Sequence, residues 1–313
     1  MNYIKKVTMG MINFLSNVRP QDKVKVKQRD NILVNVPHYN FKYLTSLKLN
    51  YGESTCSIFD EQIELNFYSF IKKESSRLII LLPGAVDRSK GAVGFQRYTW
   101  AKELNANVIS FSDPTITESN DLKIGWFQNV SANFGVNYLY KTVKSVQKQL
   151  NIKDENVCFF GSSAGGFASL KVGEFNLKAT VIAINPQIYL KNYSKNFYIP
   201  LLKYSYDRDN DLRKKYINRL KVDSKLITKR QGDTVIYQNI QDKEHVNLHL
   251  TPFINMLKPT QYNEIRLDEF EKIQPGVSVI LYDDIVAKHS PPGKSETIDF
   301  INQIFDCDKL NSN

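Results

Sequence analysis

The stretch that decides the fold is Val157–Leu170, which reads VCFFGSSAGGFASL. Four apolar residues of strand character end at Gly161, and the small residues after it lead into a segment compatible with a helix. Ser163 is therefore predicted to lie in a strand–turn–helix corner, where Gly161 and Gly165 avoid the collisions that larger side chains would make. In such a corner the backbone N–H of Ala164 points toward the space beside the Ser163 hydroxyl. This is the geometry of a serine nucleophile with an oxyanion donor.

Apolar runs of strand length recur on both sides of this corner and alternate with segments of helical periodicity. The predicted strands are 77–82, 107–111, 179–186, 234–240 and 276–284, and the predicted helices are 95–104, 136–150, a segment running to 257, and 295–305. Earlier in the chain, 56–59 and 63–71 are predicted to form a hairpin. Strands that alternate with helices indicate a doubly wound, mostly parallel sheet, so the fold class is α/β.

Taken together, these features resemble the α/β-hydrolases. The resemblance extends from about Arg77 to about Phe305. It depends on the serine corner, the turn Pro83–Ala85 and two candidates further along, Asp242 and His289. It implies a mostly parallel sheet that begins with antiparallel strands, a helical cap over the site, and acyl-transfer chemistry. We expect residues 1–50 to form an extension of uncertain structure and residues 51–313 to form the catalytic domain, with the cap at about 189–232.

By this resemblance, Ser163, Asp242 and His289 are the candidate catalytic triad, because they follow strands in the order Ser, Asp, His. His289 is the candidate general base after the last strand. Asp242 follows the strand after the cap, although Asp283 or Asp284 could take its place. The turn after the first buried strand supplies the second oxyanion donor, the N–H of Ala85 or Val86, to act with that of Ala164.

Three further residues are candidates for contacts with substrate: Arg97, Trp100 and His245. On a helix over 95–104, Arg97 and Trp100 would share one face, with a guanidinium for an anion and an indole for a sugar. An alternative is a core tryptophan and a solvated arginine.

Two patterns resemble metal sites, and neither completes one. His245 and His249 have the spacing of zinc ligands, but Val246 replaces the glutamate of a metalloprotease motif. Asp207, Asp209 and Asp211 have the spacing of a calcium loop, but the turn glycine and closing glutamate are missing, so they indicate the start of a helix. We expect no metal.

Composition limits the class of partner. The 313 residues carry a formal net charge of +10 and a pI near 9.2, which favours anionic partners. The lysines are scattered, however, and no basic run with interleaved aromatic residues resembles a nucleic-acid module, so specific nucleic-acid binding is not expected. Three distant cysteines, Cys56, Cys158 and Cys307, indicate neither a disulfide framework nor a metal motif.

The start of the chain resembles a signal peptide only loosely, because the apolar run 7–15 is short and lacks a small-residue cleavage site. No run approaches the roughly 18 apolar residues of a membrane span. We expect a cytoplasmic protein, with peripheral membrane contact through this amphipathic start as an alternative. Lys23–Lys27 alternates like a strand and could equally be a basic arm.

The sequence thus predicts serine-dependent acyl transfer through an acyl-Ser163 intermediate, on an ester or thioester substrate. Water as acceptor makes an esterase, and a sugar hydroxyl makes an O-acyltransferase. The serine corner and the His289 loop also resemble those of bacterial capsule-polysaccharide O-acetyltransferases. This resemblance makes a bacterial glycan the expected substrate and acetyl-CoA a candidate acyl donor, and no other cofactor is expected. The alternative is a non-catalytic hydrolase-fold protein that binds an anionic glycan or a biosynthesis or secretion partner. The oligomeric state is left open.

Overall fold

The computed structural model describes residues 33, 35–60, 63–119, 121–130, 132–257 and 271–306 of the chain. Contacts group these described residues as one compact unit. The expectations for the apolar run 7–15, for Lys23–Lys27 and for Cys307 lie outside the described residues.

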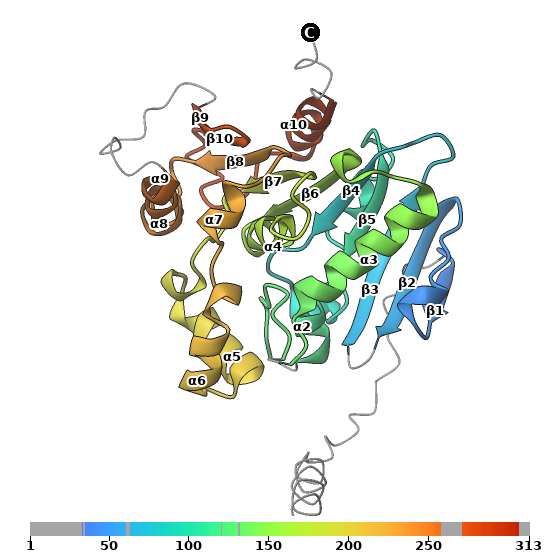
Figure 1. The fold of residues 1–313 in the computed structure, drawn as a ribbon, viewed down its shortest axis with the longest axis horizontal. Helices are drawn as coiled ribbons and strands as arrows, with labels where there is room; N and C mark the ends of the chain where they lie inside the picture. Colours follow the sequence, from blue (N-terminus) through green and yellow to red (C-terminus); the bar gives the residue numbers. More distant parts are fainter. Residues whose placement is uncertain are drawn as a thin grey trace, which may run out of the picture. The chain divides into compact units, whose positions relative to one another are not determined.

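A ten-stranded sheet organises the described part of the chain, in the order β1-β2-β3-β5-β4-β6-β7-β8-β10-β9 (Figure 1). The six neighbouring strands β5, β4, β6, β7, β8 and β10 run parallel to one another, while β3 pairs antiparallel with both β2 and β5. The strands are β1 (His38–Phe41), β2 (Gly52–Asp60), β3 (Ile63–Ile71), β4 (Leu78–Leu82), β5 (Asn107–Phe111), β6 (Val157–Ser162), β7 (Thr180–Ile184), β8 (Thr234–Asn239), β9 (Glu271–Gln274) and β10 (Val277–Tyr282). This confirms the predicted α/β class, the mostly parallel sheet and the antiparallel hairpin near its start.

The central strands are buried on both faces, which explains why they read as continuous apolar runs. In β4, Leu78, Ile80 and Leu82 belong to the core cluster that includes residues of α3 (Gly135–Leu150) and α4 (Ala164–Gly173). The alternate residues Ile79 and Leu81 belong to the cluster on the other face, with residues of α10 (Lys294–Asp306). Helices therefore cover the sheet on both sides, as Figure 1 shows for α3 and α4 on one face.

Between β7 and β8 the chain forms short helices instead of adding to the sheet, and they extend away from it in Figure 1. Asp209 caps the third of them, α6, through the N–H groups of Asp211 and Leu212, so the acidic run does start a helix. The helices are η5 (Leu190–Asn192), α5 (Lys195–Tyr206), α6 (Asn210–Lys215), η6 (Ile217–Arg219) and α7 (Ser224–Ile227). Their interpretation as a cap over the site stays a prediction.

The helix predicted over 95–104 is wrong. Only a single 3-10 turn, η3 (Tyr98–Trp100), forms there, because Arg97 adopts a left-handed backbone with φ of 66°. An α-helix cannot pass through that conformation. The remaining helices follow β5 and β8: α2 (Pro114–Glu118), α8 (Lys243–His245), the π-helix η7 (Val246–Leu250) and α9 (Thr251–Leu257), together with the short turns η1 (Leu44–Ser46), η2 (Arg88–Lys90) and η4 (Asp154–Asn156).

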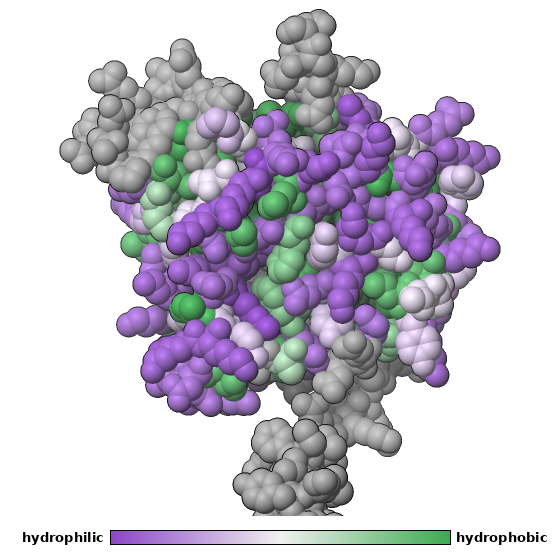
Figure 2. All heavy atoms as spheres, viewed as in Figure 1, coloured by the Kyte–Doolittle hydropathy of each residue, from purple (hydrophilic) through white to green (hydrophobic). Residues whose placement is uncertain are grey.

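The visible surface in Figure 2 is mainly hydrophilic, with hydrophobic residues scattered over it in small areas. Among the described residues, no helix is both long enough and apolar enough to cross a membrane.

Candidate active site

Ser163 lies at the corner between β6 and α4, at the carboxyl edge of the parallel strands, where α/β sheets bind ligands. Its backbone has φ of 55° and ψ of −119°, a conformation that costs a non-glycine residue about 1–3 kcal/mol. The Ser163 N–H donates to the Ile184 carbonyl on β7 at 2.9 Å, and the Ser163 carbonyl accepts the first bond of α4 from Phe167. The corner is thus fastened on both sides.

Two glycines are required for this corner. A Cβ added at Gly161 would collide with the backbone of Gly165, and one at Gly165 would collide with the carbonyl of Leu82 at the end of β4. The helix can therefore start directly beside both strands only because these positions carry no side chain.

Ser163, His289 and Asp242 form a continuous series of hydrogen bonds. His289 Nε2 lies 2.9 Å from Ser163 Oγ, and His289 Nδ1 lies 2.6 Å from Asp242 Oδ2. A neutral imidazole with its proton on Nδ1 donates to the carboxylate and accepts from the hydroxyl. The Ser163 proton therefore has a base in direct contact, and that base is held by a carboxylate.

Asp242 lies at the N-terminal cap of α8 and is 7% exposed. Burial alone would raise its pKa, but hydrogen bonds from His245 and His289 outweigh burial and hold the pKa well below its ordinary value. The carboxylates of the two alternatives bond elsewhere: Asp283 accepts from the Gln241 side chain, and Asp284 accepts from backbone N–H groups of its own loop. Asp242 is thus the carboxylate that contacts His289.

The loop that carries His289 is tied down by two buried asparagines at strand ends, which the sequence analysis did not single out. Asn239, at the end of β8, donates to the carbonyls of Asp284 and Lys288 at 2.8 Å each. Asn185, after β7, donates to the His289 carbonyl at 3.1 Å and accepts from the Asn239 N–H. The available signal was their position, because polar residues directly after buried parallel strands gather at one edge of the sheet.

Gln187 also contacts Ser163, and sequence reasoning missed it as well. Its Nε2 lies 2.9 Å from Ser163 Oγ, and its Oε1 accepts from the indole N–H of Trp126 at 3.1 Å. It too follows the end of β7, two residues after Asn185.

Of the two residues predicted as oxyanion donors, Ala164 directly follows Ser163 in the chain and Ala85 lies in the turn after β4. A Cβ added at Gly84 would lie 3.9 Å from Ser163 Cβ, so the turn after β4 borders the serine. Gln96 holds this turn, accepting from the Gly84 N–H and donating to the Ala85 carbonyl. The Val86 N–H is occupied by the Lys123 carbonyl, whereas within the described residues neither Ala85 nor Ala164 donates its N–H to another group. Of the two alternatives in this turn, Ala85 is therefore the one whose N–H makes no hydrogen bond within the described residues.

Arg97 and Trp100 meet close to the site, although not on a helix. The Arg97 guanidinium lies 5.4 Å from the Trp100 ring centre and donates to Ser162 Oγ at 2.6 Å. Desolvation lowers the Arg97 pKa to about 10, so the group stays charged at neutral pH. Ser162, which the guanidinium contacts, directly precedes Ser163 in the chain.

His245 is 3% exposed, and both of its ring nitrogens bond to protein groups, Asp242 and Gln187. This leaves no free nitrogen for the substrate contact expected from the sequence. His249 is buried too, and its Nδ1 accepts the N–H groups of Ile188 and Tyr189. The two histidines of the zinc-like spacing therefore serve internal hydrogen bonds.

Asp242, His245 and His289 bring three possible metal ligands within 4.8 Å of one another. Asp242 Oδ2 lies only 2.6 and 3.0 Å from the two Nδ1 atoms, however. Ligand atoms of a tetrahedral site with bonds of about 2.0 Å lie about 3.3 Å apart. The shorter distances between Asp242 Oδ2 and the two Nδ1 atoms fit hydrogen bonds rather than ligands of one metal ion.

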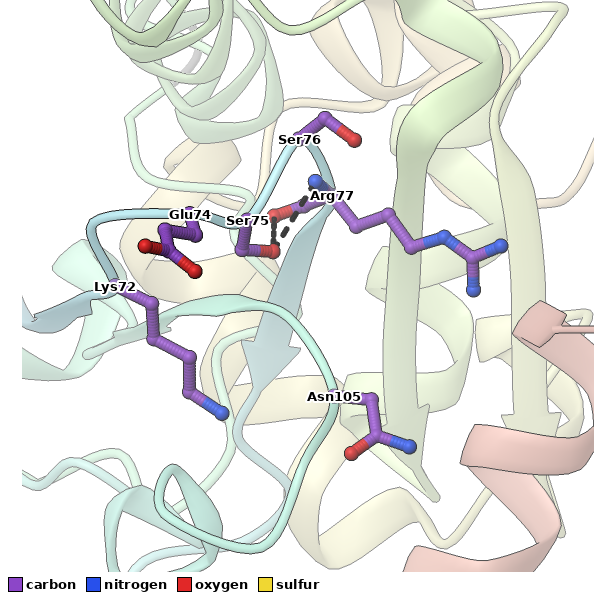
Figure 3. Close-up of a pocket in the computed structure, with 6 residues that line it drawn as sticks. All are labelled: Lys72, Glu74, Ser75, Ser76, Arg77 and Asn105. Atoms are coloured by element: carbon purple, nitrogen blue, oxygen red, sulfur yellow. Dashed lines mark hydrogen bonds between the residues drawn. The ribbon is translucent and has the colours of Figure 1, made fainter.

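A hollow of about 400 Å³ lies elsewhere on the molecule, lined by Lys72, Glu74, Ser75, Ser76, Arg77 and Asn105 (Figure 3). Its lining includes residues just before β4, at the amino end of that strand. The serine corner is at the carboxyl end of the sheet, so this hollow is separate from the candidate site.

No protein-family model matches the sequence, and neither does any curated protein. Solved structures do resemble it. A histidine-to-alanine mutant of the capsule O-acetyltransferase of Neisseria meningitidis serogroup A, in complex with CoA, aligns over 84% of this chain and 100% of its own, with a TM-score of 0.59 and 17% identity.

Two other structures match at lower identity. The Glycosylation Associate Protein (Gap123) complex from Streptococcus agalactiae aligns over 80% of this chain and 45% of its own, with a TM-score of 0.56 and 13% identity. The structure of 2,6-dihydroxy-pseudo-oxynicotine hydrolase aligns over 81% of this chain and 67% of its own, with a TM-score of 0.56 and 14% identity. Together with the parallel sheet and the serine corner, these likenesses identify the fold: the chain has the α/β-hydrolase fold.

Proposed function

We propose that this protein catalyses serine-dependent acyl transfer. The observation that carries the proposal is the hydrogen-bonded series from Ser163 through His289 to Asp242, at 2.9 and 2.6 Å, on a strained corner. His289 accepts the Ser163 proton while Oγ attacks the acyl carbonyl, and the carbonyl electrons move onto its oxygen. The N–H groups of Ala164 and Ala85 stabilise that oxyanion.

The acyl-serine forms when the tetrahedral intermediate collapses. His289 returns its proton to the leaving alcohol or thiol, and the bond from carbon to the leaving group breaks. A second hydroxyl then attacks the acyl-serine, with His289 again taking the proton. The bond from the acyl carbon to Ser163 Oγ breaks as His289 returns this proton to Oγ. Asp242 keeps the imidazole in the tautomer that accepts on Nε2.

The acceptor decides between a transferase and an esterase, and we propose a transferase that places an acetyl group on a bacterial glycan. The likeness to a capsule O-acetyltransferase crystallised with CoA supports this choice and makes acetyl-CoA the proposed donor. The cation of Arg97 and the ring of Trp100, close to the nucleophile, offer groups that would hold an anionic sugar.

Fluorophosphonate labelling tests the nucleophile. The wild type is expected to be labelled, while Ser163→Ala and His289→Ala lose labelling and Asp242→Asn slows it by about 10³-fold or more. Asp284→Asn is the matched control, because its carboxylate bonds within its own loop, and it should label like the wild type. Equal labelling of all variants would remove the catalytic assignment.

Incubation with acetyl-CoA then separates transferase from esterase. We expect acetate to appear on added capsular polysaccharide only with the wild type, and not with Ser163→Ala. Release of free acetate at a rate that no polysaccharide changes would instead identify an esterase.

The second candidate function is non-catalytic binding of a partner in glycan biosynthesis or secretion. The likeness to a glycosylation-associated protein complex favours it. A folded wild-type protein that the probe does not label would support this reading.

A further inference from the structure

Asp242 bonds to two imidazoles rather than one. Its Oδ2 lies 2.6 Å from His289 Nδ1 and 3.0 Å from His245 Nδ1. The two rings stack, with centres 4.1 Å apart and planes 26° apart. His289 is partly exposed beside the serine, while His245 is buried behind it, so the second ring contacts the first along a face that substrate cannot reach.

Gln187 closes a second route from Asp242 to Ser163. Its amide orientation follows from Trp126, because an indole N–H only donates, so the glutamine oxygen must face it. The Gln187 NH₂ group therefore faces the other two neighbours, Ser163 Oγ at 2.9 Å and His245 Nε2 at 2.8 Å. Each of its two hydrogens has an acceptor.

This orientation also fixes the proton on His245. Since His245 Nε2 accepts from Gln187, the ring carries its proton on Nδ1 and donates it to Asp242. Burial lowers the His245 pKa and favours this neutral form. A charged His245 would place a second cation 4.1 Å from His289 just when His289 takes up the serine proton.

Ser163 Oγ is consequently held from two sides. It donates to His289 and accepts from Gln187, which fixes the hydroxyl in one rotamer and leaves one lone pair for attack. As Oγ loses its proton to His289, the Gln187 N–H also stabilises the negative charge that develops on this oxygen.

We propose that Gln187 and His245 form a second arm of the site: Gln187 is a catalytic residue that donates to the attacking oxygen, and His245 is a positioning residue that orients Asp242 and Gln187. This inference rests on the proposed function, because it concerns the same nucleophile. It gives the buried His245 a role inside the site rather than in substrate recognition.

The test measures the second-order rate of fluorophosphonate labelling from pH 5 to 9, together with thermal unfolding. Gln187→Met keeps the volume but removes both donors, and we expect the plateau rate to fall about tenfold or more, the effect of one hydrogen bond strengthened in the transition state. The matched control is Gln147→Met, which removes a buried amide on α3 that bonds to the Ile152 carbonyl and to Asp154 instead. This control should unfold at a temperature close to that of Gln187→Met, but it should be labelled at the wild-type rate.

His245→Phe supplies a second readout, which a purely structural role would not move. It keeps the stacked ring but leaves Asp242 to interact with one imidazole, so the acid limb of the labelling profile should move to higher pH by about half a unit or more. Should Gln187→Met not fold, this shift decides alone.

The possible failures are distinct. A folded wild type without labelling removes the proposed function itself. A different result overturns the second arm and leaves the first intact. In that case the wild type is labelled, the plateau rate of Gln187→Met stays within twofold of the wild type, and the acid limb of His245→Phe does not move.

Discussion

Ser163 holds a backbone conformation that costs free energy, so its surroundings must stabilise it. The bond to Ile184, the start of α4 and the two contacts at Oγ all act on this one residue. The strain places the hydroxyl at the end of the strand, where His289 and Gln187 reach it from loops that follow other strands. The strained backbone and the two contacts at Oγ therefore have the same structural origin.

His249 offers a pH-dependent effect at the residue scale. Its ring is fully buried, and burial lowers its pKa to about 3, against about 6.5 in the unfolded chain. Below pH ~6.5 the unfolded chain takes up a proton that the folded protein does not, so the free energy of unfolding falls as pH drops toward 3. The expected slope from this residue is up to about 1.4 kcal/mol per pH unit.

Replacing His249 by Phe removes this titration. The variant should be less stable at every pH, because the N–H groups of Ile188 and Tyr189 lose their acceptor, yet its stability should fall less steeply between pH ~6.5 and ~4.5. Urea unfolding in steps of about half a pH unit measures the slope. Leu250→Ala, which loses core packing but no titratable group, should keep the wild-type slope. Parallel curves for His249→Phe and the wild type would contradict the argument.

The candidate residues divide by how local their signal is. Ser163 was predictable because a serine corner requires small residues at fixed spacing. Asp242 was one of three carboxylates that follow strand ends at the same edge, and only the path of the loops decides which one reaches His289. Gln187 carried no motif, because its orientation depends on Trp126, 61 positions away in the sequence.

At the element scale, buried strands were the reliable signal. Continuous apolar runs predicted β4 to β8 and β10, because strands covered on both faces contain few polar residues. The edge strands β1 and β9, of four residues each, were not predicted, since short strands leave little periodicity to detect. The helix expected over 95–104 failed where Tyr98, Thr99 and Trp100 give weak helix propensity and Arg97 turns left-handed.

The connection between β8 and the His289 loop carries an element-scale prediction. Asn239 is completely buried, donates to two carbonyls of this loop and accepts the N–H of Asp284. Asn239→Ala leaves these groups unpaired, so we expect faster hydrogen exchange over 283–290 and probe labelling slower by about tenfold or more, because His289 is no longer held in place.

The matched control is Gln241→Ala. Gln241 also bonds to this loop, through the Asp283 side chain, but at an exposed position. Its removal should leave exchange and labelling near the wild-type values. Equal effects of the two variants would mean that the buried anchor does not position His289.

At the scale of the whole molecule, the fold alone does not determine the activity. Structures that align over four fifths or more of this chain, at 13 to 17% identity, include a capsule acetyltransferase, a hydrolase and a glycosylation-associated protein. The same sheet therefore accompanies different chemistry, and the function must be argued from the residues at its carboxyl edge. The helices between β7 and β8 lie after one of the strands that contribute to this edge, so their attachment to the sheet matters.

A buried ion pair connects this helical segment to α4, the helix that begins directly after Ser163. Lys171 and Glu174 lie on and directly after α4, with Nζ and Oε2 2.5 Å apart and side chains 4% and 5% exposed. Lys171 also donates to the carbonyls of Asn218 and Lys221, and Glu174 accepts the N–H of Asp223. The pair thus holds the end of the segment 189–232 against α4.

Lys171→Met should lower the free energy of unfolding by about 3–5 kcal/mol, because it leaves the Glu174 carboxylate buried without its cation. The double variant Lys171→Met/Glu174→Gln removes both charges while keeping an acceptor for the Asp223 N–H, so it should be more stable than the single variant. Urea unfolding measures both, and Lys214→Met, which breaks the exposed pair with Asp211, should change stability by less than about 0.5 kcal/mol. If the double variant is no more stable than Lys171→Met, the unpaired buried charge is not the cause of the loss, and the lost hydrogen bonds from Lys171 to the carbonyls of Asn218 and Lys221 must account for it.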